Sequence, residues 1–368
     1  PPRARSSTRR RFGWGRTDFK GAYGSGVRDH VGYLSLLQMS VAIDGTVFAD
    51  SLDFIRSSTT LSSRYHTKNL MSYEWSFESV EVSLNYFLPR EHSLACWVEI
   101  ANRGGKERSI VTSAPHVYLT DELKWWGRDG ISVSYIDSLD ASLSKVWAYG
   151  DMFLLGGSKK SVAHKATQDK NQWERWIRSH DTSSTNKASI IGQGPMRTVQ
   201  SYLNGIPGGS SASFVVVLSR GKNESWVVHE FDSTGRRAFA ILQEKLTQDE
   251  SFWSACPMLT DDWPERWKRG WVYDYETIRM NVRDPIGIFK HPWDAMQIHS
   301  PRLVLGETSM DMMTLSYVDP SLAKEVLYGT FAAALAPNIP CVRADGSMNM
   351  ISSDGSECGT AQMWRSPF

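Results

Sequence analysis

The hydrophobic pattern of this chain changes from strand-like to helical near residue 230. Val80–Leu88 alternates apolar and polar residues, which is typical of a half-buried β-strand. A turn over 89–92 then leads into a second apolar run, Leu94–Ile100. Further short runs bounded by Gly, Ser and Asp lie at 109–113, 130–135, 152–155 and 212–218. Many short strands at this spacing favour an antiparallel sandwich over a parallel α/β sheet.

Helical segments follow this β-rich part. Residues 231–246 have helical composition and predict a linker helix that ends in the polar run 248–250. Beyond residue 260 we expect helices over 275–282, 298–317 and 319–335. Asp319-Pro320 supports the last one, because Asp caps free N–H groups and Pro suits the first turn of a helix. The short turn between the last two helices predicts an antiparallel helical hairpin.

Composition excludes several classes of protein and partner. Lys and Arg number 41 against 40 acids, so no general attraction to nucleic acid or membrane is expected. The basic run near the N-terminus indicates a disordered tail, with nucleic-acid binding as a minor alternative. No apolar run reaches the roughly 18 residues of a membrane span, and no signal-peptide core is visible. A cytoplasmic location is therefore slightly favoured, although the start at Pro1 allows a lost leader.

Motifs for cofactors and metals are missing from the sequence. The four cysteines lack CxxC spacing, so we predict free thiols in place of a disulfide scaffold or zinc site. No phosphate loop, zinc helix or nucleophile elbow is present. We therefore expect no cofactor and no metal. The 15 tryptophans are unusual, and exposed indole faces often stack on sugar rings; large sandwich cores also use many aromatic residues.

Three segments of the last third resemble the six-hairpin glycosidases. His291–Gln297 is similar to the Trp-Asp element of an early barrel helix, and Tyr317–Lys324 is similar to the turn into the next helix. The segment from Asn338 to Phe368 resembles the active-site loop that follows. The resemblance implies an α+β multidomain protein: an N-terminal antiparallel β-supersandwich followed by the first helical hairpins of an (α/α)6 barrel. The implied domains are a tail (1–19), a supersandwich (20–230), a linker helix (231–256) and a partial barrel (257–368).

The same resemblance implies a sugar site in the partial barrel. Its expected substrate-binding residues are Trp293, Asp294, His291, Gln297, Asp345 and Trp364. Asp294 would hydrogen-bond sugar hydroxyls while Trp293 stacks on the ring; the alternative is a helix cap beside a core tryptophan. His291 has a structural alternative as well, because a lone histidine is more often a satisfied structural group.

Glycoside hydrolysis requires two carboxylates, and the resemblance implies an inverting mechanism. Asp354 and Glu357 are candidates for this pair, and the alternative is a turn, since Asp-Gly segments are ordinary turn formers. In this superfamily the acid and base come from later helices, so the chain is expected to be truncated within the barrel and to lack part or all of the pair. The expected function is that of a glycoside hydrolase acting on an oligosaccharide or glycoconjugate, or the N-terminal part of one. A disaccharide phosphorylase and a non-catalytic carbohydrate-binding protein are the alternatives, and the oligomeric state stays open.

Overall fold

The computed structural model describes residues 37–90, 92–118, 130–146, 151–179, 182, 190–193, 196–295, 303–333 and 344. The chain divides into two compact units, with the division between Leu246 and Thr247. The expected tail at 1–19 lies outside the described residues. The domain boundaries expected from the sequence stay a prediction.

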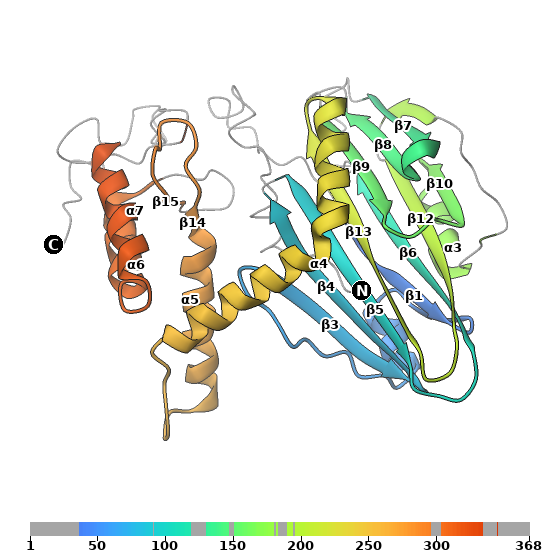
Figure 1. Cartoon of the computed structure of the whole chain (residues 1–368), viewed down its shortest axis with the longest axis horizontal. Helices are drawn as coiled ribbons and strands as arrows, with labels where there is room; N and C mark the ends of the chain where they lie inside the picture. The colour runs from blue at the N-terminus through green and yellow to red at the C-terminus, as the bar shows by residue number, and fades with distance from the viewer. Residues whose placement is uncertain are drawn as a thin grey trace. The chain divides into compact units, whose positions relative to one another are not determined.

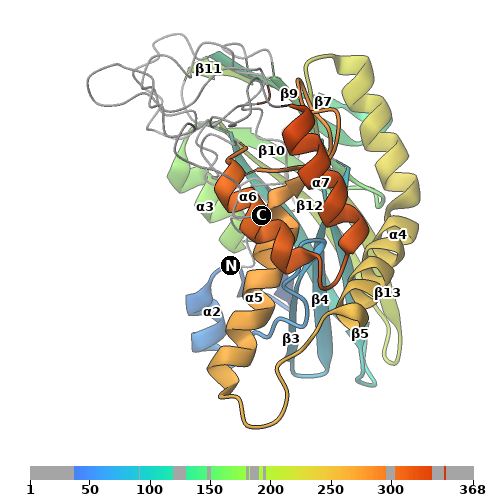
Figure 2. The same ribbon diagram turned by 90° about the vertical axis from the view of Figure 1, so that its left-hand side faces the viewer.

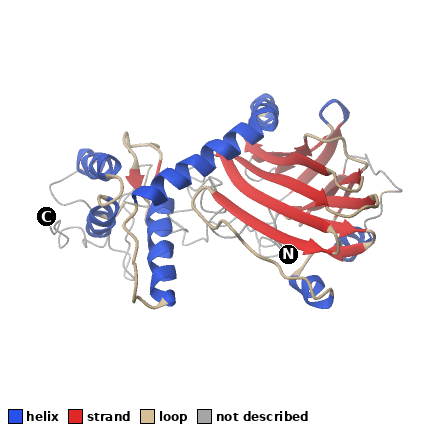
Figure 3. Ribbon diagram, turned by 60° about the horizontal axis from the view of Figure 1, so that its bottom comes forward, coloured by secondary structure: helices blue, strands red, loops and turns tan. Residues whose placement is uncertain are grey.

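The first unit contains two antiparallel sheets, drawn in red in Figure 3. The smaller has the strand order β10-β12-β6-β1-β2. Its strands are β1 (Ser40–Ile43), β2 (Thr46–Phe48), β6 (Arg108–Tyr118), β10 (Ala163–Thr167) and β12 (Met196–Ile206). The larger has the order β11-β7-β8-β9-β13-β5-β4-β3. Its strands are β3 (Leu70–Phe77), β4 (Val80–Arg90), β5 (Ser93–Asn102), β7 (Gly130–Ile136), β8 (Ala141–Val146), β9 (Asp151–Gly157), β11 (Ile190–Gln193) and β13 (Ser211–Gly221).

The two sheets share a core between their inner faces. Tyr202 of β12 contacts Phe214 of β13, with ring centroids 5.2 Å apart. Phe48 of β2 packs against Trp75 of β3 at 6.0 Å. The Tyr86 hydroxyl of β4 accepts a 3.0 Å hydrogen bond from the backbone N–H of Met39. These contacts join one sheet to the other, so the expected antiparallel sandwich is confirmed.

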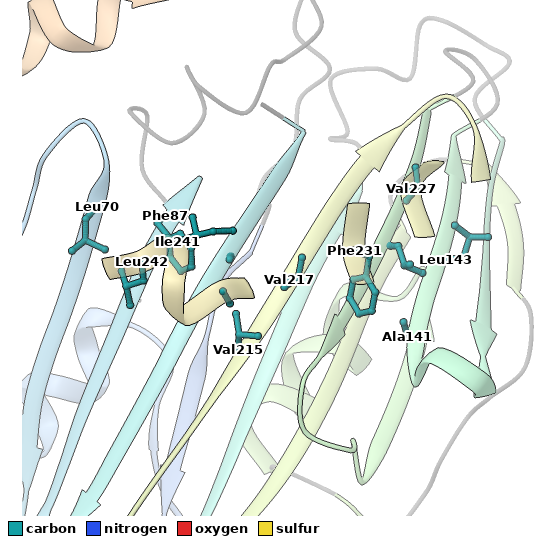
Figure 4. Packing of buried hydrophobic residues seen from close by; sticks show 13 residues of the cluster. Leu70, Phe87, Ala141, Leu143, Val215, Val217, Val227, Phe231, Ile241 and Leu242 are labelled. Carbon is teal, nitrogen blue, oxygen red and sulfur yellow. The ribbon is translucent and has the colours of Figure 1, made fainter. Parts of the chain in front are cut away.

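The other face of the larger sheet is covered by the first part of helix α4 (Glu224–Ala255). Phe231 and Ile241 of α4 belong to a buried cluster with sheet residues such as Leu143 and Val217, as Figure 4 shows. A β-carbon on Gly156 of β9 would lie 2.8 Å from the Phe231 ring, so this close approach requires glycine. The helix begins before the expected residue 231, because Asn223 accepts the backbone N–H of Trp226 and so caps the helix.

Short helices complete the first unit: α2 (Ser51–Arg56), α3 (Lys170–Ser179) and the 3₁₀ turn Asp137–Leu139. Trp173 and Trp176 lie on α3 and pack with Ile177 and Val199 on the smaller sheet. The Trp173 indole N–H donates to the Thr198 carbonyl at 3.1 Å. Both tryptophans cover the outer face of a sheet in their own unit.

The second unit is mainly helical beyond the end of α4. It contains α5 (Glu265–Asn281), the short strands β14 (Val282–Arg283) and β15 (Trp293–Asp294), α6 (Leu305–Leu315) and α7 (Pro320–Ala332). Figures 1 and 2 both show α6 and α7 side by side. Their facing residues Met312, Leu315, Ala323 and Val326 share one buried cluster. The expected helical hairpin is confirmed.

The ends of these helices differ in part from the expectation. The Asp319 side chain accepts the backbone N–H of Leu322 at 2.9 Å, with Pro320 in the first turn, as expected. Helix α5 starts at Glu265, earlier than the expected residue 275. Helix α6 starts at Leu305, and residues 296–302, where its start was expected, lie outside the described residues. Among the described helices, none is long and apolar enough to cross a membrane.

A buried ionic network holds the end of α4 against α5. The Arg279 guanidinium pairs with Asp249 at 2.8 Å and with Glu276 at 2.6 Å. It also lies 4.1 Å above the Phe252 ring. The Trp253 indole N–H donates to Glu276 at 2.9 Å. The polar run at 248–250 therefore does not end α4: Asp249 is polar because it pairs with a buried arginine, and the helix continues to Ala255.

Candidate functional site

Asp294 is the most unusual ionisable residue among those described. It lies on β15, where the register pairs it with Val282 of β14, and the next residue donates its N–H to the Asn281 carbonyl. Its exposed fraction is 0%, and neither carboxylate oxygen has a hydrogen-bond partner among the described residues. Buried carboxylates are normally paired or hydrogen-bonded, so this arrangement indicates a site that the described residues leave incomplete.

Helix α6 brings two more carboxyl groups towards Asp294. Burial raises the pKa of Asp294 to about 7, and the charges of Asp311 and Glu307 add to the rise. The positive charge of Arg283 on β14 lowers the pKa of Asp294. The Thr308 hydroxyl also acts to lower this pKa, although it is not placed to complete a hydrogen bond with either oxygen. A carboxyl group of this kind is largely protonated below neutral pH.

Asp311 has a raised pKa as well. Burial raises the pKa of Asp311 to about 6; a hydrogen bond with Asn281 lowers it, and the charge of Glu307 raises it. Asp311 and Glu307 are both partly exposed, whereas Asp294 is covered. One Glu307 oxygen is buried without a hydrogen-bond partner. We call Asp294, Glu307 and Asp311 the carboxyl cluster.

The carboxyl cluster combines donors and acceptors of hydrogen bonds. A protonated carboxyl donates one hydrogen bond and accepts others, and an ionised one only accepts. Each of the two carboxyls with raised pKa values can therefore donate a hydrogen bond to a neighbouring hydroxyl group or accept one from it. Among the described residues, no group of three or more His, Cys, Asp or Glu side chains is arranged to hold a metal ion.

Trp293 lies in the core in this structure. Its exposed fraction is 2%, its ring stacks on Phe289 with centroids 4.4 Å apart, and its indole N–H donates to the Asp284 carbonyl at 3.1 Å. These contacts anchor β15 and so position Asp294. Stacking of Trp293 on a sugar stays a prediction.

His291 lies beside α7. Its Nδ1 is 3.7 Å from a Glu325 oxygen, and its ring meets the Tyr328 ring edge-on at 5.1 Å. A β-carbon on Gly329 would lie 2.5 Å from the His291 β-carbon, so the glycine allows this close packing. The structure gives His291 contacts with α7, and its role in sugar binding stays a prediction.

The other expected site residues lie outside the described residues: Gln297, Asp345, Asp354, Glu357 and Trp364. In contrast, Glu307, Asp311 and Arg283 were missed by the sequence analysis. A signal was present, since Glu307 and Asp311 are four residues apart and share one face of a helix. No local sequence signal places that face near Asp294, because the two come together only in the folded chain.

No family model matches this sequence. No curated protein matches it either. A solved bacterial glucoamylase in complex with acarbose superposes with a TM-score of 0.52 at 9% identity, over 86% of this chain and 47% of that one. The fold of this chain is therefore similar to the corresponding part of that glucoamylase.

Two further solved structures show weaker similarity. A presumptive kojibiose phosphorylase from the human microbiome has a TM-score of 0.46 at 9% identity, over 86% of this chain and 43% of that one. A family GH92 alpha-mannosidase from Bacteroides thetaiotaomicron has a TM-score of 0.40 at 10% identity, over 89% of this chain and 44% of that one. The chain thus spans less than half the length of each of these three proteins, and at this identity the likeness concerns the fold alone.

Proposed function

We propose that this chain is part of a glycoside hydrolase and that the carboxyl cluster binds its carbohydrate substrate. The observation that carries the proposal is the buried Asp294 carboxyl with two unpartnered oxygens. The six-hairpin fold supports it, because the glucoamylase with this fold binds acarbose. A sugar hydroxyl both donates and accepts hydrogen bonds, and so suits a carboxyl group that is protonated near neutral pH.

The three carboxyls have different tasks in this proposal. Glu307 and Asp311 are partly exposed and accept hydrogen bonds from hydroxyl groups of the sugar. Asp294 forms the floor of the site behind them, and its unpartnered oxygens gain partners when substrate binds. Trp293 positions Asp294 through its contacts with Phe289 and Asp284.

The cleavage step requires an acid and a second carboxylate. In an inverting enzyme these stand roughly 6.5–9.5 Å apart, with the attacking water between them. We propose an inverting mechanism, with Asp354 and Glu357 as candidates for this pair. The raised pKa of Asp294 resembles that of a general acid. Its complete burial favours a binding role over proton transfer.

Calorimetric titration with acarbose and neutral oligosaccharides tests the binding role. Asp294→Leu removes all hydrogen bonding and is expected to weaken binding by at least about tenfold. Asp294→Asn keeps a neutral hydrogen-bonding group and is expected to retain most of the affinity near pH 7. Equal affinity of the Leu variant and the wild type would remove Asp294 from the site.

Sugar release measured with and without phosphate tests the activity. The assay compares this chain with any longer product of the same reading frame. Release independent of phosphate supports hydrolysis, and strict dependence on phosphate supports the phosphorylase alternative. Saturable binding without release in every form would favour the carbohydrate-binding alternative.

A further inference from the structure

The carboxyl cluster carries an excess of negative charge. Among the described residues, three charged groups act on Asp294: Asp311 and Glu307 from α6 and Arg283 from β14. The neighbouring Asn281 and Thr308 are neutral. With all three carboxyls ionised, three negative charges face one positive charge, and the net charge of the site is about −2.

We propose that Glu307 and Asp311 make this site select uncharged sugars over uronic acids. The inference rests on the proposed function, because it assigns a substrate class to the same carboxyl cluster. An uncharged sugar offers hydroxyl groups, which donate hydrogen bonds to carboxylates. A uronic acid brings a carboxylate of its own, which can only accept hydrogen bonds and meets the like charges of the carboxyl cluster, with Arg283 as the one opposing charge among the groups that act on Asp294.

The surroundings strengthen this repulsion. Asp294 is fully buried, and the interaction of two charges grows as the local dielectric constant falls. Arg283 supplies one positive charge, but it faces three carboxyls. The upward pKa shifts of Asp294 and Asp311 agree with this charge excess, since each ionised neighbour makes the next ionisation harder.

The test is a binding series at pH 8, where the cluster is ionised. Neutral gluco-, manno- and galacto-oligosaccharides are each compared with the uronic acid oligosaccharide of the same length and linkage. The expected result is that wild type binds the uronic acid member at least about tenfold more weakly. In the Glu307→Gln/Asp311→Asn double variant the neutral sugar should bind more weakly, because two acceptors of its hydroxyl groups are lost, and the ratio should fall to about threefold or less.

Two controls separate local charge from general effects. Asp274→Asn removes an exposed carboxylate from α5, which is not among the groups that act on Asp294, and should leave the ratio unchanged. Lowering the pH to 5 should reduce the ratio in wild type, because Asp294 and Asp311 gain protons while the uronate stays ionised. Far-ultraviolet circular dichroism verifies that each variant is folded.

The outcomes distinguish this inference from the proposed function. If neutral and uronic acid sugars bind equally, or if the double variant keeps the wild-type ratio, this inference is overturned and sugar binding still stands. If no sugar in the series binds to wild type, both are overturned.

Discussion

At the scale of single residues, the carboxyl cluster is unusual because its members weaken the fold. A carboxylate without partners in a buried position costs free energy, and evolution seldom keeps such a group without a use. Asp294 has no hydrogen-bond partner among the described residues, and Asp311 and Glu307 add repulsion. This combination favours a binding site over a packing role for Asp294.

The raised pKa of Asp294 predicts a specific pH dependence of stability. Between pH 4 and 7 the folded chain holds a proton at Asp294 that the unfolded chain releases, so stability falls as the pH rises through this range. Asp294→Asn removes this slope and should stabilise the protein at pH 8 by up to about 4 kcal/mol, with little effect at pH 4. Urea unfolding at a series of pH values measures the free energy of unfolding of both proteins. If this free energy changed with pH in the same way in wild type and in Asp294→Asn, the prediction would be contradicted.

At the scale of elements, α4 shows how tertiary contacts extend a helix beyond its local signals. Gln248-Asp249-Glu250 looks like a polar end, yet Asp249 is buried against Arg279 of α5. In Figures 1 and 4, α4 changes direction between the stretch with Phe231 and the stretch with Ile241, and both stretches pack on the sheet. Gly235 lies between them, and glycine is a common place for a helix to bend.

The Arg279 network is expected to be essential for the second unit. Arg279→Met leaves Asp249 and Glu276 charged and buried without their partner, which should cost about 3–5 kcal/mol of the free energy of unfolding. The control is Arg269→Met on the same helix, where the exposed pair with Glu265 contributes less than about 0.5 kcal/mol. Chemical denaturation compares the two, and equal effects would show that burial of the pair is unimportant.

At the scale of the whole molecule, the two compact units have separate buried clusters. The first unit has its cluster under α4, and the second has its cluster between α5, α6 and α7. Separate cores predict that a local defect loosens one unit more than the other.

Hydrogen exchange tests this separation. Gly156→Ala places a β-carbon 2.8 Å from Phe231 and 2.9 Å from Ala141, and should cost about 1–3 kcal/mol. Faster exchange is expected in β8, β9 and β13, while α6 and α7 stay as protected as in wild type. Gly105→Ala is the control, since its β-carbon meets nothing within 4 Å. Equal loss of protection in both units would contradict separate cores.

Where local pattern and tertiary environment agree, the elements could be predicted from the sequence. Val80–Leu88 alternates because one face of β4 is buried, and Asp319 caps α7 through contacts within a few residues. Strand β12 was missed because its inward residues are polar: Thr198, Gln200, Tyr202 and Asn204 are all buried. Their burial depends on the opposing sheet, so the alternation of apolar residues is hidden.

The sequence by itself determined the succession of strands, long helix and helical hairpin, because these follow from periodicity, turns and caps over a few residues. It also pointed to Asp294 through a resemblance. Only the tertiary structure decided that Glu307 and Asp311 face Asp294, that Trp293 lies in the core, and that Asp249 is paired. These facts depend on contacts between residues far apart in the chain, and the pKa of a carboxyl depends on its neighbours in space.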